Sequence, residues 1–307
     1  MPSSTPDLDL AVRPEVTPFF DEATNTLSYV VRDPASAACA IVDSVLNLDY
    51  ASGSISFSGA EQIIRFVRER EYTLEWILET HVHADHLSAA LHIRQQLGGR
   101  IAIGADITVV QETFARIFNT GPEFARDGSQ FDLLLRDGDH FSIGGMKGLA
   151  LHTPGHTPAC MTYVMGDALF VGDTLFMPDY GTARVDFPGG DAGTLYHSIQ
   201  RILSLPPEMR LFVCHDYLPD GRELEFETTV GAQRESNIHV RSGVSEADYV
   251  RMRTARDATL GMPALILPSL QVNMRAGHLP PPEETGQVFL KLPVNAFGGD
   301  DISGLFS

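Results

Sequence analysis

The segment His81–His86, with the sequence "HVHADH", concentrates residues that can bind a metal. It holds three histidines and one aspartate in six positions. His81 and His83 end a run rich in β-forming residues, and side chains two residues apart in an extended chain project from the same face. Asp85 and His86 fall where the chain turns toward a helix. Because imidazoles and carboxylates bind zinc, manganese and ferrous iron, this density predicts a metal site rather than a polar loop.

Three further candidates each follow an apolar run. His156 stands in "HTPGHTPAC", Asp173 in "LFVGDTLF" and His215 in "LFVCHDY". Each apolar run predicts a strand, and each candidate stands at the exit of its strand, so the sequence predicts that they join the first cluster. The remaining histidines lack this setting and are interpreted as ordinary surface or core residues: His92, His140, His152, His197, His239 and His278.

The composition limits the partners. Lys and Arg total 22 against 40 Asp and Glu, a formal net charge of -18. This charge repels phosphate backbones and argues against nucleic acid, and an anionic substrate would need a local positive centre such as a metal. No apolar run reaches the ~20 residues of a membrane span. We therefore expect no membrane partner and a cytoplasmic protein. Cys39, Cys160 and Cys214 lack CxxC spacing, which predicts reduced thiols rather than a disulfide or a thiolate zinc site.

Strand-like and helix-like segments alternate, which predicts sheets covered by helices. Apolar runs predict strands at 27–33, 37–45, 74–83, 100–104 and 210–217, with a strand-rich stretch over 137–176. Helical periodicity predicts helices at 60–71, 86–99, 107–118, 191–205 and 245–261, the last with Ser245 as its N-cap.

The C-terminal part is predicted to differ from the rest. Residues 1–245 form the expected catalytic domain, and 246–307 a helix followed by a Pro-rich extension packed on it. From Met262 onward the prolines predict an unhelical chain. This extension is compatible with a homodimer interface or with simple covering of the domain.

The ordered set HxHxDH, GH, GDTLF and CHDY resembles the metallo-β-lactamase superfamily over roughly residues 20–240. The resemblance implies an α/β fold, the αββα sandwich of two mixed sheets flanked by helices. It also implies a complete ligand set. One site would use His81, His83 and His156, the other Asp85, His86 and His215, and Asp173 would be shared.

Two glutathione-using branches are similar to this chain. In persulfide dioxygenases one ferrous iron would lie on His81, His156 and Asp173, with glutathione persulfide and O2 as partners. His83, Asp85, His86 and His215 would then surround the site. In glyoxalase II, the alternative, all seven residues would hold two zinc ions that hydrolyse S-acylglutathione thioesters.

Two features favour the dioxygenase. The segment "DYGTARVDF" is similar to the RxDF segment of that branch, although it departs from its commonest form, and the C-terminal helical domain of glyoxalase II is predicted to be missing. The resemblance implies a glutathione site in which Arg184 and Tyr217 contact the substrate, with Tyr180 and Arg222 as weaker candidates. A salt bridge from Arg184 to Asp186 is the alternative for that residue.

Overall fold

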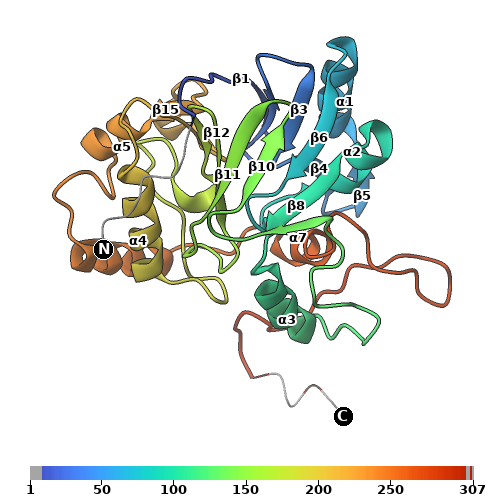
Figure 1. Cartoon of the computed structure of the whole chain (residues 1–307). Helices are drawn as coiled ribbons and strands as arrows, with labels where there is room; N and C mark the ends of the chain where they lie inside the picture. Colours follow the sequence, from blue (N-terminus) through green and yellow to red (C-terminus); the bar gives the residue numbers. More distant parts are fainter. Residues whose placement is uncertain (1–8, 302–304, 306–307) are drawn as a thin grey trace.

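Two six-stranded sheets form the centre of the computed structural model, which describes residues 9–301 and Leu305 (Figure 1). The first has the order β1 (Glu15–Asp21), β2 (Thr26–Arg32), β3 (Ala38–Val42), β6 (Thr73–Leu78), β8 (Arg100–Gly104) and β9 (Leu133–Leu135). The second has the order β10 (His140–Ile143), β11 (Met146–His152), β12 (Met161–Met165), β13 (Ala168–Phe170), β14 (Arg210–Phe212) and β15 (Glu227–Thr229). Parallel and antiparallel pairs occur in both, so the predicted mixed sheets are confirmed.

Alternation along β2 explains how the first sheet is buried on both faces. Leu27, Tyr29 and Val31 belong to the core shared with the second sheet, where the Tyr29 ring centroid lies 5.4 Å from that of Phe170. Val30 points to the opposite face and belongs to the core under the outer helices. Successive side chains of a strand face opposite sides, so one apolar run serves two cores.

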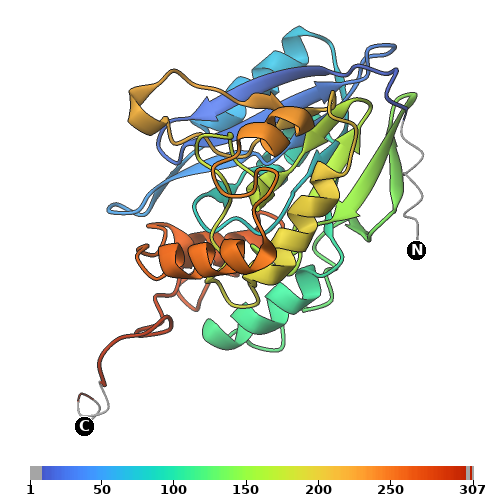
Figure 2. The ribbon, with the colours of Figure 1, turned by 90° about the vertical axis from the view of Figure 1, so that its left-hand side faces the viewer.

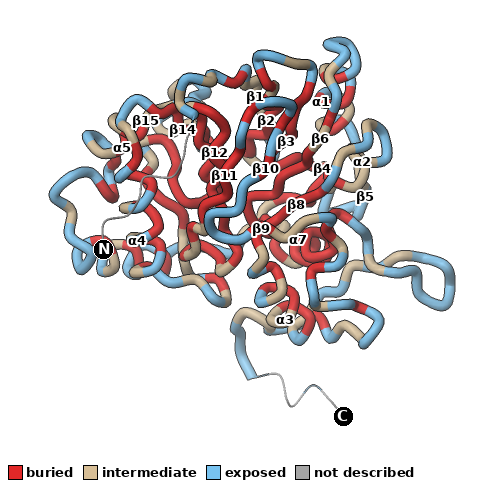
Figure 3. Tube along the Cα trace, in the orientation of Figure 1, coloured by how far each residue is buried: buried red, intermediate tan, exposed pale blue. Residues whose placement is uncertain are grey.

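Helices cover the outer faces of the sandwich. The first sheet is covered by α1 (Ser58–Glu69), α2 (Ala90–Leu97) and α3 (Ile107–Ile117), and α4 (Ala192–Leu203), α5 (Val230–Ser236) and α6 (Glu246–Asp257) lie beside the second (Figures 1 and 2). Figure 3 shows buried residues along the strands and exposed ones on the outer loops and the C-terminal stretch. The predicted αββα sandwich is therefore confirmed.

Two local predictions were wrong around the "HVHADH" segment. Strand β6 ends at Leu78, so His81 and His83 lie in a loop and not on a strand. Residues Leu87–Ser88 form β7, a short strand in a small sheet with β4 (Val45–Asp49) and β5 (Ser54–Ser56), and α2 starts only at Ala90. The loop that carries the four candidate ligands therefore connects the first six-stranded sheet to this small sheet.

The prediction of an unhelical tail was wrong for one segment, although residues 274–301 contain no helix. Residues Ile266–Asn273 form α7, which is buried along nearly its whole length. Pro268 is tolerated because it stands in the first turn, where backbone N–H groups have no partner within the helix. The predicted N-cap at Ser245 is confirmed, since its side chain accepts a hydrogen bond from the Asp248 N–H. The domain division at residue 245 remains a prediction.

None of the helices in residues 9–301 has the length and apolar character needed to cross a membrane.

Candidate metal centre

Four strand exits deliver the candidate ligands to one place. The loop after β6 carries His81, His83, Asp85 and His86. The other three come from the second sheet: His156 follows β11, Asp173 lies in the short 3-10 turn after β13, and His215 follows β14. The sequence prediction that strand exits converge is met by all seven residues, which fall into groups whose ligand atoms lie within 4.8 Å of one another.

Asp173 stands between the two groups. Its Oδ2 atom lies 3.9 Å from Nε2 of His81 and 3.7 Å from Nε2 of His156. Its Oδ1 atom faces the other way and lies 3.3 Å from Nε2 of His215, which is 3.4 Å from Oδ2 of Asp85. One carboxylate thus presents a different oxygen to each group.

Each of the five histidines uses one ring nitrogen to fix its orientation. Nδ1 of His156 donates to the Arg184 carbonyl at 2.7 Å, and Nε2 of His83 donates to Oδ1 of Asp43 at 3.0 Å. The remaining three donate through Nδ1: His81 to the Thr80 hydroxyl, His86 to the Leu87 carbonyl and His215 to the Asn25 carbonyl. Such partners select the tautomer whose other nitrogen is a free ligand.

Four of the five free nitrogens and one carboxylate oxygen are buried without a hydrogen-bond partner in the described structure. These atoms are His81 Nε2, His83 Nδ1, His86 Nε2, His215 Nε2 and Asp173 Oδ1. Leaving a buried polar atom unpaired costs about 1–3 kcal/mol, so five such atoms facing one another need a common partner. A metal ion meets this need, and the residues present fit one.

The pKa shifts divide the cluster. Despite burial, nearby carboxylates raise the pKa of His83 and His215 well above the ordinary value, whereas three other side chains already have the charge state of metal ligands. Burial and the neighbouring histidines hold the pKa of His81 well below its ordinary value, and burial lowers the pKa of His86 to about 4. Despite its burial, Asp85 has a pKa of about 2 because of His215 and His86. His81 and His86 are therefore neutral near pH 7 and Asp85 is ionised, as metal ligands must be.

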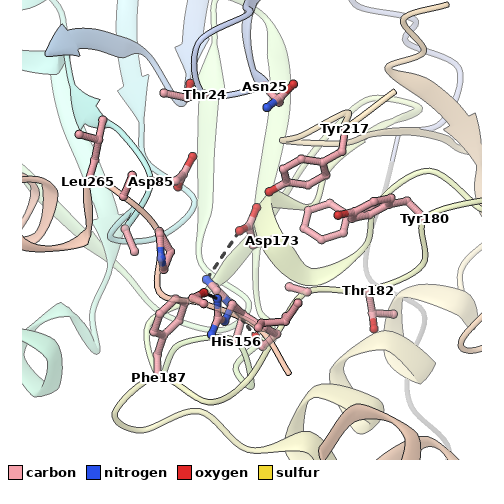
Figure 4. A pocket seen from close by; sticks show the side chains of 18 of the residues that line it. Thr24, Asn25, Asp85, His156, Asp173, Tyr180, Thr182, Phe187, Tyr217 and Leu265 are labelled. Atoms are coloured by element: carbon pink, nitrogen blue, oxygen red, sulfur yellow. Dashed lines mark hydrogen bonds and ion pairs between the residues drawn. The ribbon is translucent and has the colours of Figure 1, made fainter. Parts of the chain in front are cut away.

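A cavity of about 380 Å³ opens above the cluster (Figure 4). Asp85, His156 and Asp173 lie at its floor, and Figure 4 shows Tyr217 pointing toward Asp173. Its wall is made by aromatic, basic and small apolar residues: Phe176, Tyr180, Ala183, Arg184, Phe187, Arg253, Arg256, Leu260, Pro263 and Leu265.

The predicted substrate contacts divide into three cases. Tyr217 and Tyr180 both line the cavity and stack with ring centroids 4.6 Å apart. Arg184 lines it too, but its guanidinium donates to Asp186 at 2.6 and 2.7 Å and to the Gly261 carbonyl, as the alternative prediction held. Arg222 lies outside the cavity lining and pairs with Asp179 and Asp216.

The sequence interpretation missed the contribution of the C-terminal part. Arg253 and Arg256 of α6 and the loop that follows it, residues 260–265, form one side of the cavity. The three-residue spacing of the two arginines on a predicted helix was the available signal, since it places them on one face. Nothing in the sequence indicated that this face meets the metal-competent loops.

Fold and site together define a metal-binding αββα protein with its ligands at one edge of the sandwich. The family follows from the sequence: the model of the metallo-beta-lactamase superfamily matches residues 21–215, and the chain belongs to that superfamily. The predicted superfamily is therefore confirmed.

Relatives with different names share this fold. The chain is 56% identical to a "Probable metallo-hydrolase" of Burkholderia pseudomallei over 91% of this chain and 98% of the relative. It is 47% identical to "Glyoxylase B2" of Dictyostelium discoideum over 92% and 96%, respectively. It is 28% identical to the mitochondrial persulfide dioxygenase ETHE1 of Homo sapiens over 84% and 87%. The crystal structure of ETHE1 from Myxococcus xanthus superposes with a TM-score of 0.68 and 26% identity, covering 86% of this chain and 100% of that one.

Proposed function

We propose that this chain is a persulfide dioxygenase, which oxidises the outer sulfur of glutathione persulfide with O2 at one ferrous iron. The position of the segment Arg184–Phe187 carries the proposal. The Arg184 carbonyl orients His156, and the Phe187 ring centroid lies 5.3 Å from that of His156. The segment whose sequence resembles the persulfide dioxygenases is thus the support of a candidate iron ligand and a wall of the cavity.

The ligand set supports the same reaction. His81, His156 and Asp173 form one of the clustered groups, and two histidines with one carboxylate are the ligands of many non-heme iron oxygenases. When bound, ferrous iron supplies the capacity to activate O2 and to accept a thiolate sulfur beside it. The human and Myxococcus relatives named above, at 28% and 26% identity, add support to this assignment.

The protein's own residues then bind, orient and exclude water. The aromatic rings of Phe176 and Phe187 line the cavity and limit the access of water to the floor. Desolvation of the Tyr217 hydroxyl, with the nearby carboxylates of Asp173 and Asp85, raises the pKa of this phenol well above its ordinary value, so the hydroxyl remains protonated and can donate a hydrogen bond to the substrate. Overall, one O2 and one water are consumed, the outer sulfur loses four electrons to O2 and leaves as sulfite, and glutathione is released.

A second candidate is a dinuclear zinc hydrolase of S-acylglutathione thioesters. The bridging position of Asp173 and the unpaired nitrogens of His86 and His215 favour two ions over one. The relatives of higher identity are named metallo-hydrolase and glyoxylase, although the first name specifies no substrate. The helical wall from α6 and α7 also removes one sequence argument against this candidate. Two zinc ions would supply an activated water for attack on the thioester carbonyl.

The metal content and two parallel assays test the choice. Purified protein is analysed for iron and zinc, then given glutathione persulfide with O2 uptake followed, and S-lactoylglutathione with hydrolysis followed. We expect one iron per chain, O2 uptake only with the persulfide, and retention of iron by His86→Ala. Two zinc ions, rapid thioester hydrolysis and loss of one ion in His86→Ala would refute the dioxygenase and support the hydrolase.

A further inference from the structure

We propose that Asn273, at the end of α7, is a positioning residue of the metal centre. Its side-chain amide donates two hydrogen bonds, to the carbonyl oxygens of His83 and His86, each at 2.8 Å. Its Oδ1 atom accepts a third, from the Ser88 N–H at 2.7 Å. All three partners belong to the ligand-bearing loop and the strand that follows it, although they are at least 185 positions away in sequence.

The loop needs such a partner because it lies outside the sheets. After Leu78 the chain leaves β6, so the main-chain groups of His83 and His86 have no strand ladder to pair with. A buried carbonyl must find a donor, and here one amide serves the two residues whose free nitrogens face the metal position. Fixing both main chains at once fixes the separation of the two imidazoles, whose ring centroids lie 4.2 Å apart.

The helix that carries Asn273 is a firm base. Asn273 itself is 4% exposed. Gln111 of α3 donates to the Met274 carbonyl at 2.9 Å, which ties the end of α7 to the body of the protein. Ile266 and Leu270 of α7 pack in the same apolar core as Val82 of the loop. Because α7 is fixed by these other contacts, its hydrogen bonds to the loop restrict the movement of the loop.

The same helix offers a matched control. Gln271 is also a buried amide, 3% exposed, but it exchanges hydrogen bonds with the main chain of Lys291 at 2.9 and 2.8 Å. It anchors the C-terminal extension and bonds no residue of the ligand loop. Removing either amide costs comparable hydrogen bonding, so a difference between them in metal affinity isolates the contact with the loop.

The experiment measures Zn²⁺ affinity and not activity, so its outcome is separate from the test of the proposed function. It asks whether the free nitrogens of His83 and His86 bind the added ion, whichever metal serves the reaction. Asn273→Leu and Gln271→Leu are prepared metal-free, and the Kd for Zn²⁺ is measured by competition with a chromophoric chelator. Loss of a residue that orients ligands typically weakens metal binding about 10–100-fold. We expect this loss, and a changed Co²⁺ absorption spectrum, for Asn273→Leu but not for Gln271→Leu.

Equal affinity and identical Co²⁺ spectra in both variants would overturn the proposal and make Asn273 a purely structural residue. If Asn273→Leu does not fold, Asn273→Asp is measured against Gln271→Glu in the same way. Asn273→Asp keeps the acceptor for Ser88 but loses both donors to the His83 and His86 carbonyl oxygens. The same split in Kd is expected, and its absence would likewise overturn the proposal.

Discussion

The floor and the wall of the cavity are built in different ways. The floor comprises the seven candidate ligands, and each of its five histidines donates one ring nitrogen to a protein oxygen while the other ring nitrogen makes no hydrogen bond. On the wall, two of the three arginines are already paired, Arg184 with Asp186 and Arg253 with Asp257, whereas Arg256 forms no ion pair within the described residues. The floor is therefore incomplete without a metal, whereas the wall is largely satisfied by the protein itself.

This difference teaches how much each region reveals about function. The unpaired imidazole nitrogens and carboxylate oxygen of the floor are typical metal-ligand atoms, so the floor identifies a metal centre. Paired arginines and stacked tyrosines accept many partners of suitable shape, so the wall specifies a substrate only loosely. An anionic substrate could bind Arg256 or the Tyr217 hydroxyl, and it would have to share Arg184 with Asp186.

The largest expected effect comes from breaking the floor. His156→Ala removes a candidate ligand whose Nδ1 atom donates to the Arg184 carbonyl and whose Nε2 atom lies 3.7 Å from Oδ2 of Asp173. Several kcal/mol of metal-dependent stabilisation would be lost, which lowers kcat/KM by about three orders of magnitude and lowers the metal content. Metal analysis and steady-state kinetics check this. His197→Ala, an exposed histidine of α4 paired with Glu246, should change neither, and a comparable loss there would show that the effect is not specific to the floor.

The second largest effect is expected on stability, when a buried arginine that supports the wall is replaced. Arg253 is 1% exposed, donates to Asp257 and to the Thr182 carbonyl, and so holds the wall segment that precedes Arg184. Arg253→Met leaves the buried Asp257 carboxylate without its cation, with only the Val185 N–H still donating to it, and we expect a loss of about 3 kcal/mol in the free energy of unfolding.

Urea denaturation measures this loss, and α6 supplies the control. Arg251 pairs with Asp248 on the exposed side of the same helix, and Arg251→Met should cost no more than about 0.5 kcal/mol. Similar losses in the two variants would mean that the buried pair does not support the wall.

The floor was predictable from the sequence because its signals are local. The residue types and the position of each ligand at a strand exit are written in short segments such as "HVHADH" and "LFVGDTLF". The sandwich was predictable for a similar reason, since apolar alternation in β2 and helical periodicity in α1 are local patterns.

The wall and its supports were not predictable because they depend on contacts between distant segments. Asn273 meets His83 across 190 positions, and Arg253 meets Thr182 across 71. The prolines of the tail predicted an extended chain, but packing against the ligand loop stabilises α7 despite Pro268. Tertiary burial outweighed local propensity there.

A smaller effect concerns pH and the same wall segment. Nδ1 of His239 accepts the Thr182 N–H at 3.0 Å, which requires a neutral ring. Burial, with Arg253 and Arg256 nearby, lowers its pKa to about 4 from an ordinary value near 6.5. The unfolded chain therefore binds this proton more readily, and stability falls as pH drops from about 6.5 to about 4.

Because the His239 side chain is buried and its pKa falls from about 6.5 to about 4, we expect its share of this loss to be about 2–3 kcal/mol. His239→Gln should be less stable at pH 7 but should show a correspondingly smaller loss over the same pH range. Urea unfolding at several pH values measures both slopes. Equal slopes would mean that His239 does not contribute to the acid sensitivity of the wall.

The smallest effect is expected from the wall's own polar groups. Tyr217→Phe removes the hydroxyl that points into the cavity toward Asp173 while keeping the ring that stacks on Tyr180. One hydrogen bond to a bound substrate contributes about 1 kcal/mol, so KM for the proposed glutathione substrate should rise about fivefold with kcat changed less. Tyr196→Phe, whose hydroxyl donates to the Val244 carbonyl outside the cavity, is the control. A fall in kcat with unchanged KM would contradict this role. It would mean that the Tyr217 hydroxyl acts on the reacting atoms and does not bind the glutathione part of the substrate.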